Sequence, residues 1–269
     1  MIDARVIVGS HDVLMVTFDT LRYDVARDTF RAGRTPNVAR VLPAGGWEER
    51  HSPGSFTYAA HHAFFAGFLP TPLGPGPHPR LFAARFPGSE TTGAETFVFD
   101  APDIVSGLAD QGYHTACVGG VGFFNKQSPL GSVLPGLFAE SHWHPELGVT
   151  DPRSTERQVE LATAIAARVP RDRRLFLFLN ISAIHQPNCI FVPGAAHDTL
   201  ATHAAALEYV DRHLPALFAA FRQRGPALAL LMSDHGTAYG EDGYTGHRLA
   251  HPVVWTVPYA EFLFGEASL

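Results

Sequence analysis

The segment VLMVTFDT at residues 13–20 contains a short apolar run, Val13–Thr17, which is soon followed by the carboxylate of Asp19 and the hydroxyl of Thr20. Three similar apolar runs follow it along the chain, at Thr115–Val118, Leu175–Ile181 and Leu228–Met232. Helical patterns separate these runs, and buried strands that alternate with helices are typical of parallel βαβ units. The sequence therefore predicts an α/β fold with a parallel sheet, and it excludes an all-β sandwich.

Three amphipathic segments are expected to form longer helices. They cover Asp103–Gln111, Ser154–Arg168 and about Thr199–Arg224. Pro215 lies inside the last segment and predicts a kink or a break, because proline removes a helix hydrogen bond. The Pro- and Gly-rich stretch between Pro70 and Gly93 is interpreted as a surface loop rather than a linker. We therefore expect residues 1–269 to form a single catalytic domain.

Composition and charge exclude several classes of protein. The net charge is -6 and there is no cluster of Lys and Arg, so we expect no nucleic-acid partner. Cys117 and Cys189 cannot form a disulfide scaffold, and no apolar stretch reaches the length of a membrane span. The amino terminus also lacks a signal-peptide pattern. These features favour a cytoplasmic protein without a membrane partner, and they leave the oligomeric state open.

Polar residues stand where three of the apolar runs end. Asp19 follows the first run, His185 follows the third, and Asp234 and His235 follow the fourth. Each residue alone is more often a turn former or a structural side chain. The carboxyl ends of parallel strands meet at one edge of a sheet, so these side chains are expected to lie together. Mixed oxygen and nitrogen ligands favour a divalent metal ion at this edge.

A helix is expected from Thr57 to Ala66, with Gly67 as its stop signal. Thr57 at its amino terminus has two interpretations. It is either an ordinary N-cap hydroxyl or a nucleophile activated by a metal ion and by the helix dipole. His61 lies one turn further along the same side of this helix, where it is expected to hold a phosphoryl oxygen.

Four segments, in this order, resemble the alkaline phosphatase superfamily in its sulfatase-like branch. They are Val16–Asp24, Thr57–Pro70, Phe178–Pro187, and Ser233–Gly236 with the later pair Gly246-His247. The resemblance implies a three-layer αβα sandwich around a mostly parallel central sheet. It also implies a metal-dependent hydrolase or phosphoryl-type transferase that acts on a phosphate ester or phosphonate through a covalent phospho-threonine intermediate.

The resemblance assigns roles to individual residues. One divalent metal ion, Mn²⁺ or Zn²⁺, is expected on the ligands Asp19, Thr57, Asp234 and His235. The aspartate of a second metal set is missing, because Ala183 stands in its place in the motif. His185 and His247 are then left to contact the substrate, and one of them is expected to protonate the leaving group as general acid. Asp24 is either an extra ligand, or an N-cap or ion-pair partner.

Departures from the family pattern restrict the chemistry. A threonine at position 57 cannot be oxidised to formylglycine, so the chain is not expected to be a formylglycine sulfatase. The family's substrate-binding Lys and His are absent from Val118–Gly122, and Asn125 and Lys126 are expected to replace them. The substrate is expected to be a phosphorylated small molecule or a larger phosphoester.

The alternative from another class is a catalytically degenerate member. Such a protein would bind metal and serve as a regulatory or scaffold subunit for a phosphorylated partner. The complete set of expected ligands, with Thr57 among them, argues for catalysis, because a binding protein has no need of the threonine hydroxyl.

Overall fold

The computed structural model describes residues 2–67, 82–83, 97–98 and 103–265, so the predicted loop between Pro70 and Gly93 falls almost entirely outside the described residues. The main strands are β1 (Asp12–Phe18), β2 (Glu48–His51), β5 (His114–Val118), β6 (Glu140–His142), β7 (Leu175–Ile181), β8 (Ala227–Met232) and β11 (Thr256–Phe264). In the described chain they form a seven-stranded sheet in the order β2-β11-β8-β1-β7-β5-β6. β11 runs antiparallel to β8 and β2, and the other pairs are parallel. The mostly parallel sheet is therefore confirmed.

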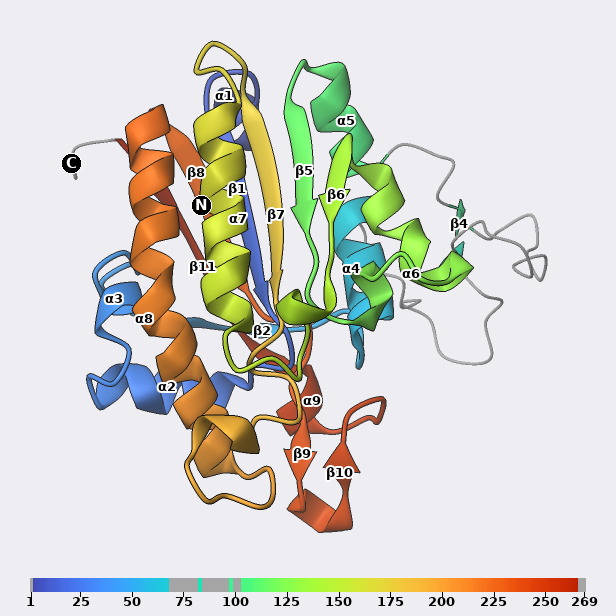
Figure 1. Ribbon diagram of the computed structural model, residues 1–269, viewed down its shortest axis with the longest axis vertical. Coiled ribbons are helices and arrows are strands. Elements are labelled where there is room, and N and C mark those ends of the chain that lie inside the picture. The colour runs from blue at the N-terminus through green and yellow to red at the C-terminus, as the bar shows by residue number, and fades with distance from the viewer. Residues whose placement is uncertain (1, 68–81, 84–96, 99–102, 266–269) are drawn as a thin grey trace.

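Helices cover both faces of this sheet. One layer contains α2 (Tyr23–Arg31), α3 (Pro36–Ala39), α7 (Ser154–Arg168) and α8 (Leu200–Arg224), and the other contains α4 (Thr57–Ala66) and α5 (Ile104–Asp110). Figure 1 shows α7 and α8 crossing the front of the sheet. Successive side chains of β1 point to opposite faces, so Leu14 and Val16 join one apolar core while Val13 and Met15 join the other. The αβα sandwich is confirmed.

The long helix α8 passes through Pro215 without ending, so a break at this residue is excluded, and a kink, the other predicted outcome, stays a prediction. Proline at this position leaves the carbonyl oxygen of Asp211, four residues earlier, without its usual helix donor. The side chain of Asn37 supplies a replacement, because its Nδ2 donates to the Asp211 carbonyl oxygen at 3.2 Å. Apolar burial of Leu214 and Leu217 on either side of the proline also holds the helix on the sheet.

Shorter elements complete the described chain. They are α1 (Ala4–Ile7), β3 (Phe82–Ala83), β4 (Phe97–Val98), η1 (Gly122–Phe124), α6 (Pro129–Val133), η2 (Pro135–Leu137), η3 (Pro145–Leu147), η4 (Cys189–Phe191), β9 (Ala238–Tyr239), η5 (Glu241–Gly243), β10 (Thr245–Gly246) and α9 (Pro252–Trp255). The hairpin of β9 and β10 lies below the sheet in Figure 1, together with α9. The assignment of residues 1–269 to a single catalytic domain stays a prediction.

Candidate active site

The carboxyl ends of β1 and β8 bring three metal-ligand side chains together. Asp19 follows β1, whereas Asp234 and His235 come shortly after its parallel neighbour β8. All three side chains are fully buried, and one donor atom from each lies within 4.8 Å of the others. The structure thus places three of the four expected ligands at one site, which we call the metal cluster.

Thr57 completes this site from the amino terminus of α4. Its Oγ1 donates to Asp19 Oδ2 at 3.3 Å and lies 3.3 Å from His235 Nε2. The N-cap position belongs to Phe56, and among the described residues no side chain caps this helix end. The N-cap interpretation of Thr57 is therefore wrong. Its hydroxyl faces the metal cluster at the end of a helix, where the dipole stabilises negative charge.

Two carboxylate oxygens of the cluster are buried without a hydrogen-bond partner in the described structure, namely Asp19 Oδ1 and Asp234 Oδ2. The second oxygen of each residue is satisfied. Asn180 Nδ2 donates to Asp19 Oδ2 at 3.1 Å, and the backbone N–H groups of Thr20 and His235 donate to Asp234 Oδ1 at 3.1 and 3.0 Å. Buried carboxylates normally have paired oxygens or bind a cation. The two unpartnered oxygens are therefore suited to metal binding.

The tautomer of His235 supports the same conclusion. Its Nδ1 lies 2.8 Å from the carbonyl oxygen of Gly236, and a carbonyl can only accept, so Nδ1 carries the proton. Nε2 then has a free lone pair, 3.5 Å from Asp234 Oδ2 and 3.9 Å from Asp19 Oδ1. A backbone carbonyl that orients a ligating imidazole is usual at metal sites. Two carboxylates, one imidazole nitrogen and one hydroxyl fit a divalent transition metal ion such as Mn²⁺ or Zn²⁺.

The electrostatics of the cluster also call for a cation. Burial raises the pKa of Asp234 to about 7, and burial together with the charge of Asp234 raises the pKa of Asp19 to about 7. Burial lowers the pKa of His235. Each change disfavours the charged form, because the loss of water on burial outweighs the attraction of the opposite charges nearby. A bound divalent cation would supply that charge and keep both carboxylates ionised.

His185 and His247, the two expected general acids, lie side by side next to the cluster. The ring centroid of His247 is 4.6 Å from that of His235 and 5.5 Å from that of His185. Nδ1 of His247 is buried without a partner in the part of the chain that the structure describes. Burial and the neighbouring histidines lower the pKa of His247 to about 3, so its ring is neutral in the absence of an anion. The roles of both residues in substrate binding and acid catalysis stay predictions.

His61 lies in a different environment from the one expected. It is fully buried, its Nδ1 lies 2.7 Å from the carbonyl oxygen of Thr57, and its Nε2 lies 3.1 Å from Thr17 Oγ1. Its ring packs edge-on against Phe124 and Phe178. Burial lowers the pKa of His61 to about 3, which keeps the ring neutral. Both ring nitrogens have partners within the protein, and contact between His61 and substrate stays a prediction.

Asn125 and Lys126 lie at a cavity that is separate from the metal cluster. The Nζ of Lys126 donates to the carbonyl oxygen of Ser141 at 3.2 Å, and Asn125 Oδ1 accepts from the backbone N–H of Gln127. Both line a cavity of about 390 Å³ that includes Trp143 but none of the cluster residues. The structure therefore does not bring these two residues to the metal cluster, and substrate binding by them stays a prediction.

Asp24 is an ion-pair partner, which was one of its two interpretations. Its carboxylate accepts from Arg22 Nε at 2.9 Å and from Arg22 Nη2 at 2.6 Å. Arg22 also pairs with Glu241. This arrangement links α2 to the segment that follows β9, and it leaves Asp24 out of the metal cluster.

Arg248 is a cation beside Phe56, the residue before Thr57, that the sequence patterns missed. Its backbone N–H donates to the carbonyl oxygen of Ser55 at 2.8 Å, and its φ of 68° lies in the left-handed region. The guanidinium carbon is 5.4 Å from the ring centroid of Phe56, the residue before Thr57. The side chain is exposed and forms no ion pair with any carboxylate in residues 2–67 or 103–265. Its position directly after His247 was the available signal.

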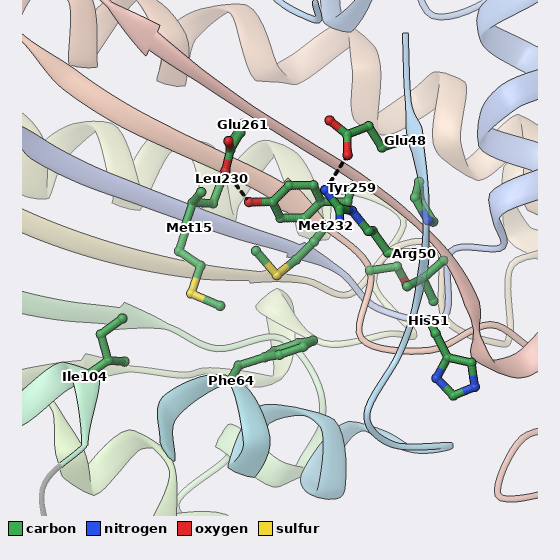
Figure 2. Close-up of a pocket in the computed structure, with 13 residues that line it drawn as sticks. Met15, Glu48, Arg50, His51, Phe64, Ile104, Leu230, Met232, Tyr259 and Glu261 are labelled. Atoms are coloured by element: carbon green, nitrogen blue, oxygen red, sulfur yellow. Dashed lines mark hydrogen bonds and ion pairs between the residues drawn. The ribbon is translucent and has the colours of Figure 1, made fainter. Parts of the chain in front are cut away.

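A larger cavity, of about 620 Å³, lies on the face of the sheet rather than at the strand ends (Figure 2). Met15, Met232 and Tyr259 line it from three strands, and Phe64 lines it from α4. Its wall includes Ser233 but none of the residues of the metal cluster. The larger cavity and the group of donor atoms therefore lie at different places, and the candidate active site is the one at the strand ends.

No family model and no curated protein matches this chain, but many solved structures do. The C-terminal periplasmic domain of the phosphoethanolamine transferase EptC from Campylobacter jejuni is 14% identical, with a TM-score of 0.64 over 94% of this chain and 79% of that one. The lipoteichoic acid synthase LtaP from Listeria monocytogenes is 12% identical, with a TM-score of 0.64 over 97% of this chain and 67% of that one. A zinc complex of the periplasmic domain of EptC from Escherichia coli is 12% identical, with a TM-score of 0.59 over 95% and 72%. The fold implied by the motif resemblance is confirmed.

These neighbours contradict the cytoplasmic location expected from the sequence. The EptC domains from Campylobacter jejuni and Escherichia coli are periplasmic. The lipooligosaccharide phosphoethanolamine transferase A from Neisseria meningitidis, whose soluble domain is also similar to this chain, is an integral membrane protein. The cytoplasmic prediction is therefore wrong. It rested largely on the small number of cysteines, and a fold with a large apolar core needs no disulfide in any compartment. Within the described ranges, no helix is both long and apolar enough to cross a membrane.

Proposed function

Because this chain has the fold of the alkaline phosphatase superfamily, we propose that it is a metal-dependent phosphoester hydrolase or transferase with Thr57 as covalent nucleophile. The observation that carries the proposal is the position of the Thr57 hydroxyl, 3.3 Å from both Asp19 Oδ2 and His235 Nε2 at a helix amino terminus. Asp19, Asp234 and His235 would hold the metal ion together with Thr57. When bound, that ion would lower the pKa of the hydroxyl and neutralise charge on the phosphoryl group.

The proposed first step forms a bond between Thr57 Oγ1 and phosphorus. The bond from phosphorus to the leaving oxygen breaks, and its electron pair stays on that oxygen. The hydroxyl proton passes to Asp19 Oδ2, which accepts its hydrogen bond in the structure. The leaving oxygen takes a proton from His247 or His185. In the second step an alcohol or water attacks the phosphorus of the phospho-threonine and gives its proton to the same histidine. The bond from phosphorus to Thr57 Oγ1 breaks, and this oxygen takes back the proton from Asp19 Oδ2.

Substrate is proposed to approach on the side of His247 and Arg248. An anionic phosphoryl group beside His247 favours the protonated ring, so substrate binding raises its pKa from about 3 towards neutrality and prepares it as an acid. The exposed guanidinium of Arg248, anchored beside Phe56, is suited to hold a phosphoryl oxygen or a second anionic group. In this proposal Arg248 supplies the positive charge that the family's substrate-binding residues, absent from Val118–Gly122, would otherwise provide.

The neighbours suggest the class of group that is transferred. The EptC of Campylobacter jejuni and the transferase A of Neisseria meningitidis are named phosphoethanolamine transferases, and LtaP is named a lipoteichoic acid synthase. By analogy we propose a substrate in which phosphorus carries a small alcohol besides the leaving group. Transferase and hydrolase differ only in the acceptor, which is an alcohol in the first case and water in the second. Formylglycine chemistry has no place in this scheme, because Thr57 stands at the nucleophile position.

The test combines metal analysis with trapping of the intermediate. Purified protein loaded with Mn²⁺ or Zn²⁺ is incubated with phosphate monoesters, diesters and phosphonates, and its peptides are analysed by mass spectrometry. We expect turnover of at least one ester class and a mass increase on the peptide that contains Thr57, with neither in Thr57→Ala. Bound metal without turnover or modification on any of these esters would favour the degenerate regulatory member.

A further inference from the structure

We propose that Asn180 positions both the metal ligand Asp19 and the nucleophile Thr57. It contacts Asp19 directly and reaches Thr57 through Thr17 and His61. This inference rests on the proposed function, because it explains how the reacting groups are held. It assigns His61 a positioning role within the protein in place of the expected contact with substrate.

The orientation of the Asn180 amide is fixed by one backbone contact. Asn180 is fully buried near the end of β7, and its Oδ1 lies 3.0 Å from the backbone nitrogen of Val121. A backbone N–H can only donate, so this atom of the amide must be the oxygen. Nδ2 then donates its two hydrogens to Thr17 Oγ1 at 3.2 Å and to Asp19 Oδ2 at 3.1 Å. No hydrogen-bonding capacity of the amide nitrogen is left over.

The Thr17 hydroxyl connects Asn180 to His61 on α4, and the direction of each hydrogen bond is again fixed. The Nδ1 of His61 lies 2.7 Å from the Thr57 carbonyl oxygen, which only accepts, so Nδ1 carries the proton of the neutral ring. Nε2 must then accept, and its partner at 3.1 Å is the Thr17 hydroxyl. Thr17 therefore accepts from Asn180 and donates to His61. Every hydrogen bond from Asn180 to the backbone of Thr57 has a single possible direction.

This network joins three elements at the level of the metal cluster. Thr17 and Asn180 are direct partners in the register of β1 and β7, and His61 lies on α4, with all three side chains fully buried. Asp19 Oδ2 is held from two sides, by Asn180 and by the Thr57 hydroxyl. The unpartnered Oδ1 is thereby left for the metal ion. Partners that orient metal ligands commonly contribute 10–100-fold to metal affinity or activity.

A purely structural network would behave differently. It would lower the melting temperature when broken and leave metal affinity unchanged. Thr115 offers a matched control, because it is also a fully buried threonine in the central sheet, and its Oγ1 accepts from the backbone of Ala139 at 2.9 Å. Thr115→Val loses a buried hydrogen bond without touching the network.

The test measures binding of Mn²⁺ or Zn²⁺ alone to the metal-free full chain by calorimetry, together with the melting temperature. Asn180→Leu removes both donors from the network and should weaken metal binding roughly 10–100-fold. Thr17→Val keeps the side-chain shape and should weaken it about tenfold, at the low end of the same range. Thr17→Ser should restore near wild-type affinity, and Thr115→Val should lower only the melting temperature. With a turned-over ester, Thr17→Val should lower kcat and leave KM unchanged.

Wild-type metal affinity and kcat in Thr17→Val would overturn the proposal, and so would losses no larger than those of Thr115→Val. If Asn180→Leu does not fold, Thr17→Val and its serine rescue decide the question. If the wild-type chain turns over no ester, the proposed function fails on its own account. The metal affinities then test the positioning role alone. Weaker metal binding in Thr17→Val would support it, and unchanged metal binding would overturn it.

Discussion

Replacing Asp234 by asparagine should stabilise the metal-free chain above neutral pH and at the same time remove its metal binding. Asp234 is fully buried, and its Oδ2 has no hydrogen-bond partner among the described residues. The carbonyl oxygen of an asparagine can keep the two backbone hydrogen bonds that Oδ1 accepts from Thr20 and His235. Its amide nitrogen would then take the place of Oδ2, which lies 3.5 Å from His235 Nε2, and could donate to the lone pair of that nitrogen. The substitution replaces an uncompensated carboxylate with a neutral, bonded group.

The magnitude follows from the pKa of Asp234, which burial raises from 3.8 to about 7. The folded state therefore holds this proton more tightly than the unfolded state, so the stability that Asp234 contributes is complete below pH 3.8 and is lost as pH rises to about 7. A pKa difference of about 3 corresponds to about 4 kcal/mol. Asp19 titrates together with Asp234, so we assign about half of this, ~2 kcal/mol, to the single substitution. For a chain of this size that is a rise in melting temperature of about 4 to 8 °C.

The assay is thermal unfolding at pH 5 and pH 8, with chelator and with excess Mn²⁺ or Zn²⁺. With chelator at pH 8, Asp234→Asn should melt above the wild type, and the difference should shrink at pH 5, where Asp234 is protonated. With metal at about 1,000 times its dissociation constant, the wild type should gain about 4 kcal/mol, whereas the variant should gain nothing. Metal therefore reverses the order of the two proteins at pH 8.

Asp12→Asn is the matched control, because Asp12 is equally buried but fully partnered. Its Oδ2 accepts from Arg224 Nε at 2.7 Å, and its Oδ1 accepts from the backbone of Leu175 at 2.8 Å. Breaking this pair should cost about 3 to 5 kcal/mol at pH 8. If Asp234→Asn destabilises the metal-free chain as Asp12→Asn does, the reasoning about an uncompensated carboxylate is refuted. A metal-dependent rise that survives in Asp234→Asn would remove this residue from the ligand set.

Further predictions concern the metal content, the nucleophile, the acid and the cation. Purified protein should contain about one transition metal ion per chain by elemental analysis, and a ratio near two would contradict the one-metal site. Thr57→Ala should abolish ester turnover with an unchanged melting temperature and Thr57→Ser should keep part of it, whereas a wild-type rate in Thr57→Ala would make water the nucleophile. His247→Ala should slow alkyl esters by roughly 10²–10⁴-fold and p-nitrophenyl esters far less, because the second leaving group departs as a stable anion. His61→Ala should slow both esters alike, and equal losses in His247→Ala would move the acid role to His185 or to water. Arg248→Ala should raise KM about tenfold, with partial recovery in Arg248→Lys, and an unchanged KM would exclude phosphate contact by this side chain.

The strands at the centre of the sheet could be predicted, because both of their faces are buried and their sequences are continuous apolar runs. β7 spans the predicted Leu175–Ile181, and β1 extends the predicted Val13–Thr17 by one residue at each end. β11 could not be found in this way. Pro258 and Glu261 interrupt its apolar pattern, and five of its nine residues are partly exposed. β2 carries no apolar residue at all, since an edge strand needs only backbone pairing.

In the candidate site, too, some residues could be predicted from their position in the sequence, whereas the environment of others depends on packing. Asp19, Asp234 and His235 could be placed together because each follows a parallel strand. For His61, helical spacing indicates only that it shares a side with Thr57. It does not indicate that this side faces the sheet, where Thr17 and the phenylalanine rings enclose the imidazole.

Lys126 and Arg248 show the limit of reasoning from proximity in sequence. Lys126 was chosen because it stands a few residues after the altered family motif, but the turn of the chain points its ammonium to the carbonyl of Ser141. Arg248 reaches Phe56 because its backbone is tied to Ser55, a contact between residues almost two hundred positions apart. Such long-range contacts decide which cation lies beside the start of α4, and no local pattern contains them.

The hairpin of β9 and β10 has a consequence for how this protein can change its substrate. Asp19, Asp234 and His235 come shortly after the central strands β1 and β8 and are fully buried, so a larger side chain at any of these positions would disturb the core. His247 and Arg248 come directly after a ribbon that is paired only at Thr245 with Tyr239 and at Gly246 with Ala238. Insertions or exchanges in this ribbon would change the surroundings of His247 and Arg248 while the buried metal cluster stays intact. Selection for a new phosphoester therefore has a separate segment on which to act, and libraries randomised between Gly240 and Gly246, which keep His247 and Arg248, are the direct way to use it.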